Sequence, residues 1–132
     1  MKMRFNTQDA FMQSMEESIQ KNVSLAAYNT FRFAYHAEYF AIAETLDSLK
    51  KLLAWANHFN QTVTMIGGGS NLLISADVTG LVIINRLSGI NAREHRGNLV
   101  SLTVAAGENW HQVVAFAVQE GWFGIENLAL IP

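Results

Sequence analysis

The centre of this sequence reads Thr62-Val63-Thr64-Met65-Ile66-Gly67-Gly68-Gly69-Ser70-Asn71, a β-branched and apolar run followed at once by three glycines. The run predicts a buried strand, because Val, Ile and Thr are enriched in strands. Glycines in this place can arrange successive backbone N–H groups around one concavity, a nest that binds phosphate oxygens without a lysine. The Ser70 hydroxyl and the Asn71 amide add two donors. A tight turn without a ligand explains the glycines alone equally well.

Two familiar phosphate-binding patterns do not match this loop. The P-loop needs a lysine directly after its last glycine, and no lysine follows Lys51 in this chain. The dinucleotide fingerprint needs a third glycine that opens a helix. Here Leu72, Leu73 and Ile74 follow instead, and they predict a further strand-like segment.

The segment before the central strand predicts a strand and then a helix. Residues 38–43 form the short strand, with an apolar and aromatic composition. Thr45 then suits a helix N-cap, and Asp47 suits the first turn. The helix has one apolar stripe at helical spacing, made of Leu46, Leu49, Leu52, Leu53, Ala56 and Phe59. With the central strand, these segments predict a β-α-β unit.

Flanking elements complete an α+β domain with mixed strand pairing. Residues 8–21 predict an amphipathic helix, and residues 80–85 and 99–105 predict strands. A last helix begins near Asn109, and Gly121 suits its left-handed C-terminal cap. Its apolar stripe consists of Trp110, Val113, Val114, Ala117 and Val118. Three strand-like runs without an intervening helix disfavour a doubly wound sheet. We expect three parts: a helical extension (1–23), a first α+β subdomain (24–77) and an incomplete second subdomain (78–132).

Composition excludes several classes of protein. The chain has 132 residues, 50% of them hydrophobic, and a net charge of −2, so it lacks the basic excess of a nucleic-acid binder. It has no cysteine, and its four histidines have no metal-ligand spacing. No signal peptide or membrane span is evident, so a cytoplasmic location is expected. The apolar end, residues 127–132, predicts a chain cut inside a core.

Four stretches from Tyr28 onward carry a resemblance to a known family. They are Asn29-Thr30-Phe31; Gly67-Gly68-Gly69-Ser70-Asn71-Leu72-Leu73; Val82-Ile83-Ile84-Asn85-Arg86 with Gly89-Ile90; and Ala105-Ala106-Gly107-Glu108-Asn109-Trp110 with Gly124-Ile125-Glu126-Asn127-Leu128-Ala129-Leu130-Ile131-Pro132. In order and spacing this series resembles the N-terminal part of bacterial UDP-N-acetylenolpyruvoylglucosamine reductase, or UDP-N-acetylmuramate dehydrogenase. The resemblance covers residues 28–132.

The resemblance implies an oxidoreductase with the FAD-binding fold of the vanillyl-alcohol-oxidase-like (PCMH-type) proteins. In that family NADPH reduces the flavin, which passes hydride to a UDP-sugar enolpyruvyl ether and makes UDP-N-acetylmuramate for peptidoglycan. It implies that the glycine loop holds the FAD pyrophosphate and that the segment ending in Ile-Pro reaches the flavin. The cofactor-binding residues expected are Gly67, Gly68, Gly69, Ser70, Asn71, Leu72, Gly107, Leu130, Ile131 and Pro132.

The resemblance also implies what this chain lacks. The family's catalytic arginine, serine and glutamate all lie beyond the position that matches Pro132, so no catalytic residue is assigned here. We expect the 132 residues alone to bind FAD weakly and not to turn over substrate. Two alternatives remain open: a non-catalytic module that self-associates through its unfinished edge, and another flavin oxidoreductase of the same fold.

Overall fold

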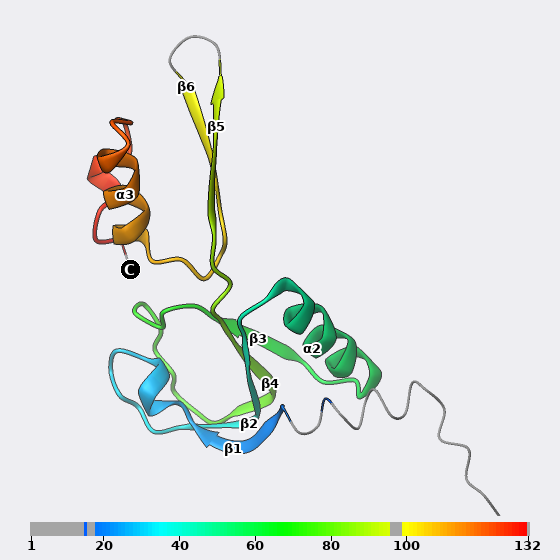
Figure 1. The fold of residues 1–132 in the computed structure, drawn as a ribbon. Helices are drawn as coiled ribbons and strands as arrows, with labels where there is room; N and C mark the ends of the chain where they lie inside the picture. The colour runs from blue at the N-terminus through cyan, green and yellow to red at the C-terminus, as the bar shows by residue number, and fades with distance from the viewer. Residues whose placement is uncertain (1–14, 16–17, 96–98, 132) are drawn as a thin grey trace, which may run out of the picture.

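The computed structural model describes residues 15, 18–95 and 99–131. Figure 1 shows a sheet flanked by a helix, from which a long two-stranded ribbon and a second helix extend. In chain order the elements are β1 (Gln20–Ser24), the 3-10 helix η1 (Leu25–Tyr28), β2 (His36–Ala43), α2 (Leu46–His58), β3 (Val63–Ile66), β4 (Val78–Asn85), β5 (Ile90–His95), β6 (Leu99–Val104), α3 (Trp110–Gln119) and the 3-10 helix η2 (Glu126–Leu128). The expected α+β class is confirmed.

The larger sheet has the strand order β1-β2-β4-β3. β1 pairs antiparallel with β2, whereas β2 and β3 both run parallel to β4. β4 therefore lies between the two strands of the predicted β-α-β unit. Its residues 80–84 are all buried, as expected for a central parallel strand that is covered on both faces.

Two apolar clusters form the core, one on each face of this sheet. Leu81 and Ile83 pack with residues of α2, and Val82 and Ile84 pack on the other face with Leu25 of η1. The alternation follows from the two-residue period of a strand. Figure 1 shows α2 on one side of the sheet and η1 on the other.

The strand Val63–Ile66 is present, but the expectation that it is buried was wrong. Val63, Thr64 and Met65 are exposed, and only Ile66 is buried. The reason is its place in the sheet, because β3 is an edge strand that pairs only with β4. Its end at Ile66, directly before the glycines, agrees with the prediction.

Helix α2 begins at the predicted cap. The Thr45 hydroxyl accepts from the N–H of Ser48 and the Ser48 hydroxyl accepts from the N–H of Thr45, both at 3.1 Å, which makes a capping box. The buried face differs from the predicted stripe, because it consists of Leu52, Trp55 and Ala56, and Leu46, Leu53 and Phe59 are exposed. The Trp55 side chain is buried on this face, and its ring centroid lies 5.2 Å from that of Tyr39.

The predicted N-terminal helix is only partly within the described residues. Residues 8–14 and 16–17 lie outside them, Met15 is helical, and both Met15 and Ile19 join the core on the α2 face. The helix does not continue to residue 21 as predicted, because β1 begins at Gln20 and pairs with β2. Backbone pairing along β2 outweighs the local helical spacing.

Between residues 72 and 105 one expected strand is absent and one unexpected strand is present. Residues 72–74 form no strand, and a strand that was not predicted, β5, pairs with β6 as an antiparallel ribbon. β5 contains Asn91, Arg93 and Glu94, so it lacks the apolar alternation that identifies a strand. Helix α3 was predicted correctly, with Asn109 as its N-cap and Gly121 at a positive φ of 75° after its end. Of its predicted stripe, Trp110 and Val118 are exposed.

The sheet extends beyond residue 77, where we expected the first subdomain to end. β4 starts at Val78 and lies between β2 and β3. The separate two-stranded sheet begins only at Ile90. We therefore propose that the first subdomain ends after Asn85.

Candidate functional site

The glycine loop lies at the carboxyl edge of the parallel strands. Residues 67–71 directly follow β3, and residues 86–89 directly follow its neighbour β4, whose Ile84 is paired with Ile66. Carboxyl ends of parallel strands meet at one edge of a sheet, where ligands bind in open α/β sheets. This edge therefore brings together two of the segments that the sequence singled out.

The three glycines of the loop have different environments. Gly67 and Gly68 are exposed, and a Cβ at either would meet no backbone atom within 4 Å. Gly69 is buried, with φ of +69°, and a Cβ there would overlap the carbonyl oxygen of Tyr28. Gly67 and Gly68 thus leave space for a ligand, whereas Gly69 leaves space for the chain itself.

Hydrogen-bond donors of the loop point to no protein acceptor. Within the described part of the chain, none of the five backbone N–H groups from Gly67 to Asn71 donates a hydrogen bond, nor do the Ser70 and Asn71 side chains. Four of these residues are exposed, the exception being Gly69. Free N–H groups beside a positive-φ glycine are the donors from which anion-binding nests are made.

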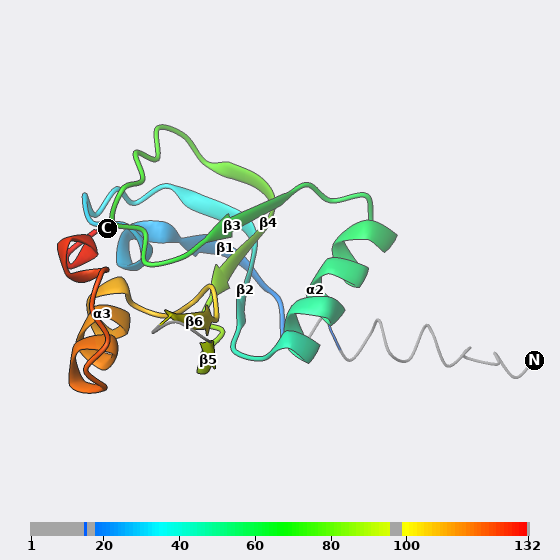
Figure 2. The same cartoon turned by 90° about the horizontal axis from the view of Figure 1, so that it is seen from above.

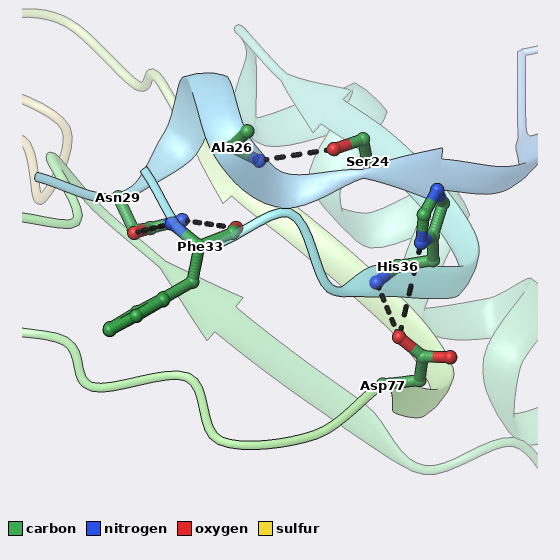
Figure 3. A network of polar contacts seen from close by, with 6 residues as sticks. All are labelled: Ser24, Ala26, Asn29, Phe33, His36 and Asp77. Atoms are coloured by element: carbon green, nitrogen blue, oxygen red, sulfur yellow. Dashed lines mark hydrogen bonds and ion pairs between the residues drawn. The ribbon is translucent and has the colours of Figure 1, made fainter. Parts of the chain in front are cut away.

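The Asn29-Thr30-Phe31 segment is hydrogen-bonded to the glycine loop. The Thr30 N–H donates to the carbonyl oxygen of Gly69 at 3.2 Å. The neighbouring Asn29 is 4% exposed and is the only buried polar residue among those described. Its amide donates to the carbonyls of Leu25 at 2.7 Å and Phe33 at 3.1 Å, and its Oδ1 accepts from the Phe33 N–H at 3.0 Å. Figure 3 shows this side chain between η1 and the chain that leads to β2.

Sequence reasoning did not assign Asn29 to the site. In the sequence it is one residue of the Asn29-Thr30-Phe31 motif, and the motif alone gives it no role of its own. The available signal was one asparagine within an otherwise apolar and aromatic stretch, between residues 25–28 and Phe31 and Phe33. Such a residue is expected to be buried, and a buried amide is expected to be hydrogen-bonded. The contact between Thr30 and Gly69 could not be read from sequence, since 39 positions separate them.

Gly107 lies in the segment between β6 and α3. Its N–H donates to the Leu87 carbonyl at 3.1 Å, and a Cβ at Gly107 would lie 2.5 Å from the Leu87 nitrogen. The next residue, Glu108, accepts from the Gly89 N–H at 2.5 Å. The segment before α3 is therefore fixed closely against the loop that follows β4. Its close approach is to backbone of this chain.

The remaining predicted site residues differ in their burial. Leu72 is half-buried and packs against the core on the η1 face. Leu130 is exposed, with φ of +67°, and Ile131 is also exposed. Pro132 lies outside the described residues. In both ribbon views the red C-terminal segment ends on the side of the molecule that carries the loop after β3 (Figures 1 and 2).

The described ranges lack the features of two other kinds of site. No group of three His, Asp or Glu side chains in them could hold a metal ion. No helix in them is long and apolar enough to cross a membrane. The closest His–Asp contact joins His36 Nδ1 to Asp77 Oδ1 at 3.9 Å, with both side chains well exposed (Figure 3).

Free N–H donors and open glycines at the carboxyl edge of parallel strands define a domain of the nucleotide-cofactor-binding class. The chain belongs to the FAD-binding domain family, whose model matches residues 37–132. Exposed glycines and unpartnered donors fit a diphosphate such as that of FAD, because they leave room for its oxygens and supply N–H groups to them.

Curated proteins similar to this chain are larger reductases. The chain is 41% identical over 118 residues to the UDP-N-acetylenolpyruvoylglucosamine reductase of Chromobacterium violaceum, covering 89% of this chain and 35% of that protein. It is 42% identical over 111 residues to the protein of the same name from Escherichia coli K12, covering 84% and 32%. The chain thus spans about a third of the length of these relatives.

A solved structure shares the fold. The crystal structure of the UDP-N-acetylenolpyruvylglucosamine reductase of Thermus caldophilus matches 86% of this chain and 39% of its own, with a TM-score of 0.59 and 23% identity. The expected FAD-binding fold is confirmed by this likeness together with the family match.

Proposed function

We propose that this chain is the FAD-binding portion of a UDP-N-acetylenolpyruvoylglucosamine reductase. FAD, when bound, would supply hydride transfer from NADPH to the enolpyruvyl group of a UDP-sugar, giving UDP-N-acetylmuramate for peptidoglycan in the cytoplasm. The family match and the names of the relatives support this assignment. They also favour it over another flavin oxidoreductase of the same fold.

The residues of this chain would bind and orient the cofactor. The N–H groups of Gly67, Gly68 and Ser70 would hold the pyrophosphate oxygens, with the side chains of Ser70 and Asn71 as further donors. Leu72 would support the loop from the core. Gly107, Leu130, Ile131 and Pro132 would lie toward the rest of the cofactor. No residue of the chain is assigned to the chemical step.

One observation carries the proposal: the exposed loop after β3 has free donors and no side chain on its first two residues. A tight turn alone needs a glycine only where φ is positive or space is short. Gly67 meets neither condition, because its φ is not positive and nothing lies within 4 Å of its would-be Cβ. Access for a ligand explains a glycine there.

Gly67→Ala tests this explanation. We expect the substitution to leave the unfolding temperature unchanged, because the new methyl group meets nothing in the protein. It should weaken FAD binding at least fivefold, because the methyl group occupies the space that phosphate oxygens need. Titration of the chain with FAD, followed by flavin fluorescence and by amide chemical shifts, measures both affinities. Binding by the parent chain should be weak, since small sites rely on nearly complete enclosure.

The matched control is Ala54→Gly on the exposed side of α2. It exchanges the same two residue types, alanine and glycine, outside the loop. It should lower stability by about 1 kcal/mol and leave FAD affinity unchanged. Equal FAD affinities for the parent chain and Gly67→Ala would contradict the assignment of the loop. We expect neither protein to oxidise NADPH with the UDP-sugar, because the chain spans only a third of its relatives.

A further inference from the structure

We propose that Asn29 is a positioning residue for the cofactor, and that it acts on the pyrophosphate loop through the backbone N–H of Thr30. The inference rests on the proposed function, because it names what orients the donors of that same loop. The juxtaposition on which it depends is the hydrogen bond from Thr30 to Gly69.

The first step concerns Asn29. Its side chain bonds residues on both sides of itself in the chain, at Leu25 and Phe33. All three bonds use backbone partners, so the side chain fixes the path of the backbone from η1 to the segment before β2 (Figure 3). A buried and fully bonded amide is rigid, because any rotation leaves a buried polar group unpaired.

The second step concerns the peptide unit between Gly69 and Ser70. Its carbonyl oxygen accepts from the Thr30 N–H. In a trans peptide the carbonyl and the N–H of one unit point in opposite directions, and the described residues contain no cis peptide bond. The Ser70 N–H must therefore point away from the Thr30 segment. It has no acceptor in the described protein, and Ser70 is exposed.

The third step concerns Gly69. Its missing Cβ lets the backbone of Tyr28 approach, since a Cβ there would overlap the Tyr28 carbonyl oxygen. The Asn29 segment and the loop thus touch at two residues, Tyr28 and Thr30, one on each side of Asn29. This double contact holds the loop in one orientation before a ligand arrives. Such preorganisation raises affinity, because less conformational freedom is lost on binding.

The test separates the Thr30 N–H from the Thr30 side chain. Thr30→Pro removes the N–H that donates to Gly69, together with the Thr side chain. Asn29 already has the extended conformation that a following proline requires, with φ of −144° and ψ of 147°. Thr30→Ala keeps the N–H and is the matched control. Asn29→Asp removes the two amide donor bonds and keeps the acceptor for Phe33.

The probe is inorganic pyrophosphate, and amide chemical shifts of the ¹⁵N-labelled chain report its binding. We expect the Ser70 amide of the parent chain and of Thr30→Ala to move most, with equal dissociation constants. Thr30→Pro and Asn29→Asp should bind about tenfold more weakly, as for one lost charge-assisted donor, and should lose the large Ser70 shift. Circular dichroism confirms that each variant is folded.

Results other than these would overturn either the cofactor loop or the positioning role of Asn29. If pyrophosphate moves no amide between Gly67 and Asn71 in the parent chain, the proposed cofactor loop itself is wrong. If the parent binds and the folded Thr30→Pro variant binds equally well, the positioning role is wrong. Should that variant not fold, hydrogen exchange of the parent decides: a Thr30 amide that exchanges as fast as a free peptide overturns the inference, because the bond to Gly69 would not persist.

Discussion

Each glycine of the central loop has its own reason to be glycine. Gly69 combines a positive φ with contact to the Tyr28 carbonyl, whereas Gly67 and Gly68 have neither constraint. At the residue scale, the folding role and the binding role of the motif are therefore carried by different positions. Substitution should separate them.

Gly69→Ala should destabilise the chain strongly. The new Cβ must occupy the left-handed region and also displace the Tyr28 carbonyl, so we expect a loss of about 2–4 kcal/mol in the free energy of unfolding. Gly68→Ala is the control, because the nearest atom to its Cβ would be the Ser70 hydroxyl oxygen at 3.9 Å. Urea unfolding measures both, and similar midpoints for the two variants would refute this division of roles.

A carboxylate completes the pairing of β2 with β4. The register advances by two residues on β2, from Ala37 to Tyr39, and by three on β4, from Val78 to Leu81, so β4 carries a bulge. Gly80 lies in this bulge with φ of +79°, and its N–H donates to Glu38 Oε2 at 2.8 Å instead of to a strand carbonyl.

Glu38→Ala should therefore leave the N–H of the buried Gly80 without an acceptor. We expect a loss of about 1–3 kcal/mol in unfolding free energy. Glu38→Gln keeps an acceptor oxygen and should lose less than half as much. The measurement is again urea unfolding, and equal losses for the two substitutions would contradict the reasoning that an unpaired Gly80 N–H causes the loss.

At the scale of the element, α2 combines a strong cap with a weak ion pair. The capping box joins Thr45 and Ser48, while Lys51 Nζ lies 2.6 Å from Asp47 Oδ2 with the carboxylate largely exposed. Thr45→Ala should cost about 1 kcal/mol, because a donor of the first turn loses its partner. Lys51→Ala should cost less than about 0.5 kcal/mol, because water screens an exposed pair. Thermal unfolding that ranks the two variants in the opposite order would contradict this reasoning.

Local chemistry made α2, α3 and the end of β3 predictable. Each of the two helices has a cap residue and a helical apolar period within a few positions of one another, and α3 also has a glycine after its end. β5 was not predictable in this way, because its pairing with β6 supplies what its polar composition lacks. The exposure of β3 was missed for a related reason. The sequence of a strand does not show whether the strand has a neighbour on one side or on both sides.

At the scale of the whole molecule, the strand order β1-β2-β4-β3 depends on contacts between distant residues. Nothing local to residues 20–24 indicates that they pair with β2 rather than extend a helix. The loop at the carboxyl edge was predicted because its donors are contiguous in sequence. The support from Asn29 and Thr30 was not, because it exists only once residues 30 and 69 are brought together by the fold.

Several large apolar side chains are exposed among the described residues, and they predict self-association of the isolated chain. Leu73 is 73% exposed, Phe31 61% and Leu130 80%. Exposed apolar surface of this kind drives association between copies. We expect sedimentation equilibrium to give an average mass that rises above 14.7 kDa with concentration.

The double substitution Leu73→Asp with Leu130→Asp should return that mass to the monomer value, because two charges would have to be buried in the contact. Aspartate also tolerates the positive φ at position 130 better than leucine does. Leu46→Asp is the control, because Leu46 is 58% exposed at the first turn of α2 and α2 covers the face of the sheet opposite to η1 (Figure 1). It should leave association unchanged. A parent chain that stays monomeric at millimolar concentration would show that these side chains form no contact surface between copies.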